Sequence, residues 1–348
     1  MKRFALALPV SGAILLLLGT LAGPGPANRG GAVEEPAPAE GEAGPAVYRI
    51  VVPGLSHDLP KRATLAAVGD VMLARSVGEA IVTSGPAVPF AGVAAALRGA
   101  DIAVANLECA ISERGEPAPK GFTFRAPPQA ADALLDAGID VVSLANNHIL
   151  DYGPDALADT VALLDARGIG HAGAGADANG ARAPVIVTGG GLRVAFLSYV
   201  DVPLEWRGFD TRQWEAGAGT PGVAWLHIGN LAADVAAARK LADVVVVLMH
   251  FGFEEQYSPS ETQRAQARAA IDAGAALVIG HHPHVLQPVE WYGNGLIAYS
   301  LGNFVFDGWD NPSNETAILF AELSDEGVLS YRMAPARIDG SGYPHLVD

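Results

Sequence analysis

The sequence predicts an α/β domain, and three features of the chain support this. From Thr64 onward, short apolar runs alternate with stretches of helical periodicity. Nearer the C-terminus, apolar runs follow one another without helical patterns between them, which is typical of antiparallel hairpins. The 348 residues are 50% hydrophobic and 17% charged, enough for a sizeable core and unlike a largely disordered chain. We therefore expect an α/β domain whose sheet is completed by late hairpins.

The expected elements follow in order along the chain. Continuous apolar runs predict strands at 64–68, 102–105, 140–144, 193–199, 244–249 and 276–279, and later at 289–291, 296–299, 317–323 and 328–333. Helical patterns cover 74–82, 93–97, 128–137, 154–167 and 231–241. A last helix is expected to open at Ser258-Pro259-Ser260-Glu261, with a capping box and Pro259 at its first position, and to end at Gly274.

The N-terminus has the pattern of a targeting segment. Residues 1–22 combine a basic start, Lys2-Arg3, with an almost wholly apolar run, and are interpreted as a signal peptide or an N-terminal membrane anchor. Both alternatives predict an exported domain, with cleavage left open. Residues 23–60 form a Pro/Ala/Gly/Glu-rich linker, and residues 61–340 the folded domain.

Composition narrows the classes of partner and cofactor. Lys and Arg total 22 against 38 Asp and Glu, so the net charge is −16, and we expect no nucleic-acid partner. An excess of acidic residues is compatible with a site that binds cations, although solubility is the commoner reason for such an excess. Cys109 is the only cysteine, which excludes an intrachain disulfide, a Cys-rich metal centre and a lipid-modified cysteine after the apolar run.

Polar side chains of metal-ligand type follow several predicted strands. In an open α/β sheet, ligands bind beyond the carboxyl ends of the strands, so these side chains are expected to converge on one crevice. Carboxylates, amides and imidazoles are ligands of Zn²⁺, Mn²⁺ and Fe²⁺. The residues are Asp70, Asn106, Glu108, Asn147, His148, His250, His282 and His284.

Taken singly, most of these residues have a structural alternative. Asp70 fits a helix N-cap, Asn147 fits a turn, and His250 fits a core histidine. The run His281-His282-Pro283-His284 is different, because three histidines in four residues are rarely structural. Proline between His282 and His284 is expected to stiffen an extended segment, so that both imidazoles face one side.

Six short motifs resemble those of the CapA family of capsule (poly-γ-glutamate) biosynthesis proteins, in that family's order. They are AVGDVMLAR at 67–75, ANLE at 105–108, SLANNH at 143–148, MHFG at 249–252, GHHPHVLQ at 280–287 and SLGNF at 300–304. That family is similar to the calcineurin-like metallophosphatases. The resemblance therefore implies a four-layer α/β/β/α sandwich with a site for two divalent ions, Mn, Zn or Fe.

The resemblance also implies roles for individual residues. The metal ligands would be Asp70, Glu108, Asn147, His250, His282 and His284. His148 would be the catalytic group that assists the leaving group. Two positions depart from the phosphatases: Met72 stands where they have a ligand histidine, and Glu108 where they have a bridging aspartate. These departures imply one weakened metal position.

Further residues are assigned to the substrate-binding side of the crevice. Arg75 and Arg125 have the chemistry to clamp an anionic group, with surface salt bridging as the alternative for each. Glu254 is expected to accept a hydrogen bond from an imidazole, and Asn303 to line the crevice. The full set is Arg75, Asn106, Arg125, Asn146, Glu254 and Asn303.

Three functions are compatible with these observations. The first is an exported, membrane-tethered CapA-like component of anionic polymer production, which acts on or binds the cell-envelope polymer or its intermediates beside membrane synthase partners. The second is a free-standing periplasmic or extracellular metal-dependent hydrolase of phosphoester or amide bonds. The third is a surface-binding module on the same fold without catalysis.

Overall fold

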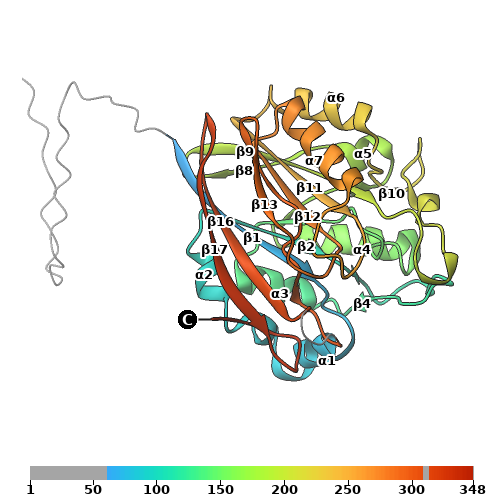
Figure 1. The fold of residues 1–348 in the computed structure, drawn as a ribbon. Coiled ribbons are helices and arrows are strands. Elements are labelled where there is room, and N and C mark those ends of the chain that lie inside the picture. The colour runs from blue at the N-terminus through green and yellow to red at the C-terminus, as the bar shows by residue number, and fades with distance from the viewer. Residues whose placement is uncertain (1–60, 309–312, 348) are drawn as a thin grey trace, which may run out of the picture. The chain divides into compact units, whose positions relative to one another are not determined.

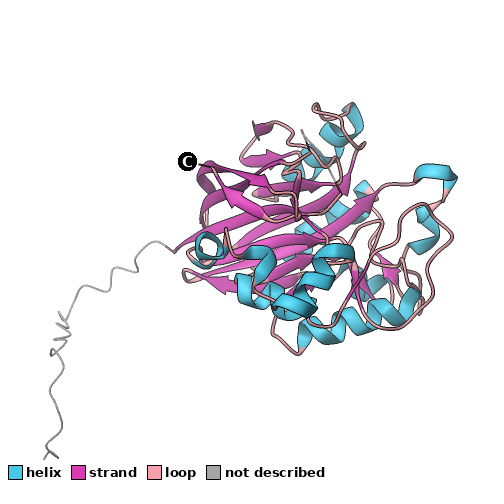
Figure 2. Cartoon of the chain, turned by 90° about the horizontal axis from the view of Figure 1, so that it is seen from below, coloured by secondary structure: helices cyan, strands magenta, loops and turns pink. Residues whose placement is uncertain are grey.

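The computed structural model describes residues 61–308 and 313–347. The predicted targeting segment, 1–22, and the predicted linker, 23–60, lie outside the described residues. The described chain forms two large sheets that pack face to face, with helices on the outer face of each sheet (Figure 1). Figure 2 gives a second view of the same helices and strands, turned by 90°.

The first sheet has eight strands, and its centre is parallel. Strand β1 (Arg62–Val71) lies between β2 (Ile102–Leu107) and β16 (Glu315–Ser324). The parallel side continues through β5 (Val141–Ser143) and β6 (Gly170–Ala172), and the antiparallel side through β17 (Gly327–Ile338) and β18 (Pro344–Leu346). The short strand β15 (Asn303–Val305) pairs in parallel with the end of β1.

The second sheet has six strands. Its parallel centre consists of β9 (Leu192–Asp201), β11 (Val244–Phe251), β12 (Leu277–His281) and β14 (Gly295–Ala298). Antiparallel strands β8 (Val185–Gly189) and β13 (Val289–Tyr292) form its edges. Two small pairs lie apart from it: β3 (Ala110–Ile111) with β4 (Arg125–Ala126), and β7 (Ala174–Gly175) with β10 (Gly222–Val223).

Helices cover the outer face of each sheet. On the first sheet these are α1 (Arg75–Ser84), α2 (Ala94–Arg98), α3 (Ala130–Ala137) and α4 (Gly153–Asp165), with η1 (Val88–Phe90) between α1 and α2 along the chain. On the second they are α5 (Ala178–Arg182), α6 (Ile228–Ala238) and α7 (Glu261–Ala273). Two short turns, η2 (Trp206–Gly208) and η3 (Thr211–Trp214), belong to the excursion between β9 and β10.

Alternating side chains of the central strands pack into two different cores, one between the sheets and one under the helices. This explains the continuous apolar runs. In β1, Leu65 packs in the core between the sheets, whereas Ala66 packs in the core under the helices. In β11, Val246 lies between the sheets and Val247 under the helices. A strand buried on both faces needs apolar residues at every position. The four-layer α/β/β/α sandwich and the α/β class are therefore confirmed.

The structure differs from the sequence analysis in two details of the elements. The late strands complete two sheets instead of one, because β13 pairs with β14 in the second sheet while β16, β17 and β18 extend the first. The last helix is capped by Ser260, whose side chain accepts from Gln263 N–H while the Gln263 side chain accepts from Ser260 N–H. Pro259 thus precedes the cap instead of occupying the first helical position.

Gly69 tests how tightly the end of β1 is packed. A Cβ at this position would lie 1.9 Å from the carbonyl oxygen of Gly302, which accepts the backbone N–H of Asp70 at 3.0 Å. We expect Gly69→Ala to lower the free energy of unfolding by at least about 2 kcal/mol, because backbone must move to relieve the clash. Urea denaturation of the purified chain measures this.

Gly229 provides the matched control, since a Cβ there would meet nothing within 4 Å and the residue lies within α6. Gly229→Ala is expected to stabilise the protein by about 0.5–1 kcal/mol. Equal unfolding midpoints for Gly69→Ala and the unmutated chain would contradict the packing argument.

Candidate metal centre

The carboxyl ends of strands from both sheets meet at the candidate site. Register places Asp70 of β1 beside Asn106 of β2 on one side and beside Asn303 of β15 on the other. In the second sheet, His250 of β11 pairs with His281 of β12. The two sheets are joined here, because Asn106 Nδ2 lies 3.2 Å from His250 Nδ1. The convergence predicted from the strand ends is therefore observed.

Asp70, Glu108 and His250 form one set of potential metal ligands. Each is fully buried, and one ligand atom from each lies within 4.8 Å of the others. Asn106 Nδ2 donates to Asp70 Oδ1 at 2.8 Å and lies 3.2 Å from Glu108 Oε2. Glu108 Oε1 is enclosed without a hydrogen-bond donor among the described residues. A buried carboxylate oxygen without a donor suits a cation, which would also stabilise its ionised form.

Glu254, His282 and His284 form a second set, with ligand atoms again within 4.8 Å of one another. His284 Nδ1 donates to Asn303 Oδ1 at 2.8 Å, and its Nε2 lies 3.8 Å from Glu108 Oε1. That second distance is too long for a hydrogen bond, but two ligands of one ion can have this separation.

Asn147 adds an amide oxygen to this cluster. Its Oδ1 lies 2.7 Å from Nε2 of His250, while its Nδ2 donates to Glu205 Oε1 at 2.8 Å. The amide orientation is therefore fixed by Glu205, and the oxygen is left facing the histidine side of the site.

The backbone of the His-Pro-His segment corrects one expectation. His282 and His284 have φ values of 93° and 57°, so the segment is a turn with left-handed residues instead of an extended strand. Their ring centroids lie 5.7 Å apart, and that of His282 lies 4.9 Å from that of His250. The turn, and not an extended backbone, brings the imidazoles together.

His148 lies at the edge of the cluster and is oriented on two sides. Its Nδ1 is 2.7 Å from Asp151 Oδ2, and its ring stacks on Phe124 with centroids 4.2 Å apart. Its Nε2 lies 3.9 Å from Glu108 Oε1. With Nδ1 engaged by a carboxylate, Nε2 is the ring nitrogen that faces the candidate ligands.

A buried lysine that the sequence analysis missed joins the loops beside His148. The Lys120 side chain is 0% exposed, and its Nζ lies 2.8 Å from Asp151 Oδ1 and 2.6 Å from Glu205 Oε1. It also donates to the carbonyl oxygen of Asn147 at 2.5 Å. No motif distinguished Lys120, Asp151 or Glu205, although Asp151 follows His148 by three residues.

Burial dominates the electrostatics of the cluster. It raises the pKa of Glu108 well above its usual value, and the neighbouring Asp70 carboxylate adds to this. Burial, reinforced by His284, lowers the pKa of His282 to about 3. Burial raises the pKa of Asp151 to about 7, although Lys120 opposes the shift. The imidazole ring of His282 is therefore neutral, and the neutral imidazole is the form in which histidine binds metals.

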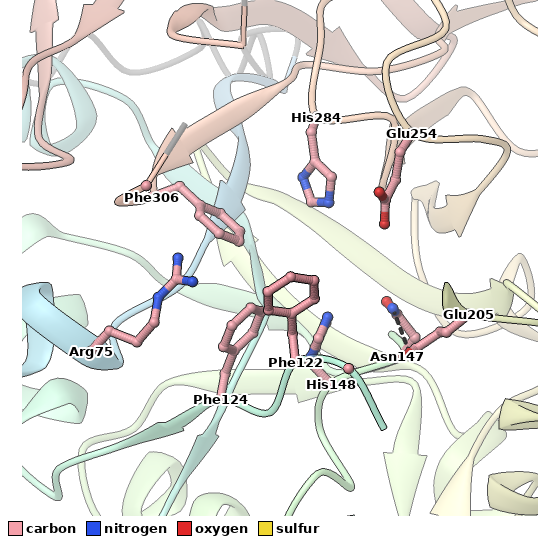
Figure 3. Close-up of a pocket in the computed structure, with 11 residues that line it drawn as sticks. Arg75, Phe122, Phe124, Asn147, His148, Glu205, Glu254, His284 and Phe306 are labelled. Carbon is pink, nitrogen blue, oxygen red and sulfur yellow. Dashed lines mark hydrogen bonds between the residues drawn. The ribbon is translucent and has the colours of Figure 1, made fainter. Parts of the chain in front are cut away.

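A cavity of about 460 Å³ opens onto these side chains. Figure 3 shows His284, Glu254 and Asn147 around it, with His148 beside Phe124. Arg75 also lines the cavity, and its Nη2 is 2.5 Å from Asp307 Oδ1. The cavity therefore combines candidate metal ligands with one guanidinium and aromatic surface.

The other predicted substrate-binding residues do not line this cavity. Asn106, Asn146 and Asn303 are 0% exposed, and their amides bond to neighbouring site residues and backbone. Arg125 Nη1 donates to the carbonyl oxygens of Arg114 and Gly115, and its guanidinium lies 4.2 Å from the ring centroid of Tyr152. These placements favour structural roles over contact with a substrate.

Comparison with known proteins identifies the family. Residues 64–308 match the model of the family described as bacterial capsule synthesis protein PGA_cap. The chain belongs to this family. The capsule biosynthesis protein CapA of Bacillus anthracis is 33% identical over 304 residues, which cover 83% of this chain and 71% of that protein. The PGA biosynthesis protein CapA of Bacillus subtilis is 32% identical over 275 residues, covering 78% and 70%.

Solved structures show the same type of fold. A crystal structure titled as a novel phosphatase from Mycoplasma pneumoniae aligns with a TM-score of 0.50 and 10% sequence identity, over 80% of this chain and 94% of that one. At this identity the likeness concerns the fold alone, which is metallophosphatase-like. The two candidate ligand sets, and not this likeness, are the observations that bear on metal use by this PGA_cap protein.

The structure shows what Met72 does at the position where phosphatases carry a ligand histidine. Met72 is fully buried, and its Sδ lies 3.2 Å from the backbone nitrogen of Ala74, whose N–H it accepts. Its side chain packs with the core of the first sheet and the helices.

Among the described residues, no helix is long and apolar enough to cross a membrane.

The Lys120 cluster generates a stability prediction. Lys120→Met keeps the aliphatic stem but leaves Asp151 and Glu205 without their cation, so we expect a loss of about 3–5 kcal/mol of unfolding free energy. Lys61→Met is the control, because Lys61 is 52% exposed and 3.4 Å from Asp243. It should change stability by about 1 kcal/mol or less. Equal unfolding midpoints for the two variants would refute the role given to Lys120.

Proposed function

We propose that this PGA_cap family member is an exported, membrane-tethered protein of anionic cell-envelope polymer biosynthesis, and that it has a metal-dependent hydrolytic site. The observation that carries the proposal is the enclosed group of carboxylates and imidazoles at the strand ends, which opens onto a cavity with His148 at its edge. The family membership and its capsule-related relatives support the polymer class.

The residues present fit divalent metal ions. Asp70, Glu108, Asn147, His250, His282 and His284 would hold them, by the oxygen and imidazole donors that Mn²⁺, Zn²⁺ and Fe²⁺ accept. The fit rests on buried atoms without hydrogen-bond partners in the described chain, Glu108 Oε1 and His282 Nδ1. When bound, such ions polarise the oxygens of an anionic group and lower the pKa of water.

Side chains of the protein itself are placed to bind an anionic substrate, to orient the catalytic imidazole and to protonate the leaving group. His148 is placed to give a proton from Nε2 to a departing oxygen in the cavity when its ring is an imidazolium, whose Nδ1–H Asp151 accepts. Burial and the Lys120 ammonium lower the pKa of His148, so the ring has to take up this proton before it can act as an acid. Arg75 can attract an anionic substrate, and its contact with Asp307 keeps the guanidinium at the cavity wall. Phe124 stacks on the imidazole of His148 and restricts its rotation.

The proposed substrate class is based on the residues that line the cavity. Glu205 and Glu254 line the cavity along with Arg75, so a polyanion would meet repulsion unless metal ions offset it. We therefore propose that the site takes one anionic group at a time, from the polymer or a lipid-linked intermediate, beside a membrane synthase partner. A free-standing hydrolase of phosphoester or amide bonds would use the same groups.

One observation favours a binding module over an enzyme. Met72 removes a ligand that the phosphatases have, and its thioether is engaged with backbone instead of facing the site. A module of this kind would retain metal and polymer affinity without turnover. The unmutated full-length chain decides between them: turnover of aryl phosphates, phosphodiesters or γ-glutamyl amides with Mn²⁺ or Zn²⁺ supports the enzyme, and none supports the module.

Paired histidine variants separate proton donation from metal retention. His148→Ala should keep bound metal and the melting temperature but lose about 10²–10⁴-fold in turnover, the usual contribution of general acid catalysis. His250→Ala should lose metal as well. Metal content, melting temperature and turnover are measured on the same preparations. If His148→Ala lowers only the melting temperature, His148 merely bonds its loop.

The double variant His282→Ala/His284→Ala tests the metal assignment itself. Removing both imidazoles should abolish metal binding, measured by elemental analysis of the purified full-length protein. Unchanged metal content in this variant would refute the ligand assignment.

The basic start and apolar run of residues 1–22 support export. A reporter enzyme fused after Gly54 should be active only on the outer side of the membrane. Activity of the fusion in the cytoplasm would contradict the proposed location.

A further inference from the structure

Glu254 has a position that its assignment to substrate binding does not explain. It lies three residues beyond β11, and Figure 3 shows its side chain directed into the cavity alongside His284. A carboxylate oxygen of Glu254 and one ring nitrogen each of His282 and His284 lie within 4.8 Å of one another. Donor atoms that share one ion lie within about 4.3 Å, twice a metal–ligand bond of about 2.1 Å. A shift well below 1 Å would bring the three donors into coordination distance.

The backbone holds the two loops of this group together. Glu255 N–H donates to the carbonyl oxygen of Pro283 at 2.9 Å, so the loop after β11 is bonded to the turn between the two histidines. Gly252 and Glu255 have φ values of 98° and 57°, which turn the loop back toward the site on both sides of Glu254. The main chain at Glu254 is therefore held beside the histidine turn, although the Glu254 side chain is itself exposed.

His282 provides an independent indication of a ligand here. His282 is 4% exposed, and its Nδ1 has no hydrogen-bond partner among the described residues. Buried ring nitrogens normally find a partner. Two imidazoles and one glutamate form a donor set that holds zinc in catalytic sites with an open position.

We propose that Glu254 is a metal ligand, and that it completes with His282 and His284 a coordination site in which Met72 supplies no donor. The inference rests on the proposed function, because it requires that the cluster binds a divalent ion. It replaces the role of Glu254 as a group that contacts substrate. The metal would then lie at the cavity wall, directly accessible to an anionic group that enters past Arg75.

Metal titration of the full-length chain tests the proposal, with Glu255 as the matched control because it neighbours Glu254 on the same exposed loop. Metal is removed with a chelator, and Mn²⁺ or Zn²⁺ is titrated back by calorimetry. Glu254→Gln should weaken the affinity for at least one bound metal ion by tenfold or more, since the loss of even a residue that only orients a ligand lowers metal affinity by about 10–100-fold. Glu255→Gln should match the unmutated protein. The proposal is overturned if Glu254→Gln binds the same number of ions with affinities within about threefold.

Cobalt spectroscopy distinguishes direct coordination from a loss of local order. With Co²⁺ bound, Glu254→Gln should shift the visible d–d bands, because a carboxylate ligand is replaced, and Glu255→Gln should leave them unchanged. Unshifted bands in a folded, Co²⁺-loaded Glu254→Gln protein overturn the proposal even if the affinity falls. If the unmutated chain binds no metal, the proposed function fails too. If it binds metal and the His282→Ala/His284→Ala variant does not, while Glu254→Gln binds normally, only the role of Glu254 fails.

Discussion

Charge enclosed between two sheets is the constraint on which the site depends. Asp70 and Glu108 are both 0% exposed, and desolvation opposes ionisation of each. His284 nevertheless keeps the pKa of Asp70 low, while that of Glu108 rises well above normal. Two neighbouring carboxylates in a low dielectric cannot both be stable as anions, so Glu108 is held protonated unless a cation joins the pair. The four-layer sandwich creates this constraint, because it covers both faces of the strands that lead into Asp70 and Glu108.

Buried amides, and not only the candidate ligands, define the geometry of this centre. Asn146 Nδ2 donates to Asn106 Oδ1 at 3.1 Å, while its Oδ1 accepts from the backbone N–H groups of His148 and Ile149. One side chain therefore fixes the loop that presents Asn147 and His148 to the strand that presents Asn106. Asn303 fixes the His284 ring in the same way through Nδ1. Asn106, Asn146 and Asn303 were assigned to substrate binding from the sequence, and their bonds to neighbouring site residues favour a role in orienting the candidate ligands.

The α/β class and the meeting of polar residues at the strand ends were predictable because they depend on local pattern, whereas the four-layer arrangement and the residue roles were implied only by the resemblance to the CapA family. Apolar runs gave the central strands, and the polar residues that follow them had to meet at one edge. The short β15 was missed, since three residues carry no periodicity. The Lys120–Glu205 contact joins residues 85 apart in loops, which no spacing rule indicates. The turn at His282 depends on positive φ at non-glycine residues, an arrangement that tertiary structure imposes and sequence pattern does not.

The position of Lys120 bears on whether the centre is catalytic. Burying an ammonium group together with two carboxylates adds little net stability to a fold, because desolvation offsets their attraction. Apolar side chains of similar volume often stabilise the same place equally well. Yet Lys120 is fully buried between Asp151 and Glu205, the groups that orient His148 and Asn147. A module that only retained metal would need Asn147, which Glu205 holds, but it would not need the carboxylate of Asp151 on Nδ1 of His148. This pairing of a buried cation with the carboxylate partner of His148 supports the proposed proton transfer by its geometry, while burial and Lys120 both lower the pKa of His148 and so oppose its protonation.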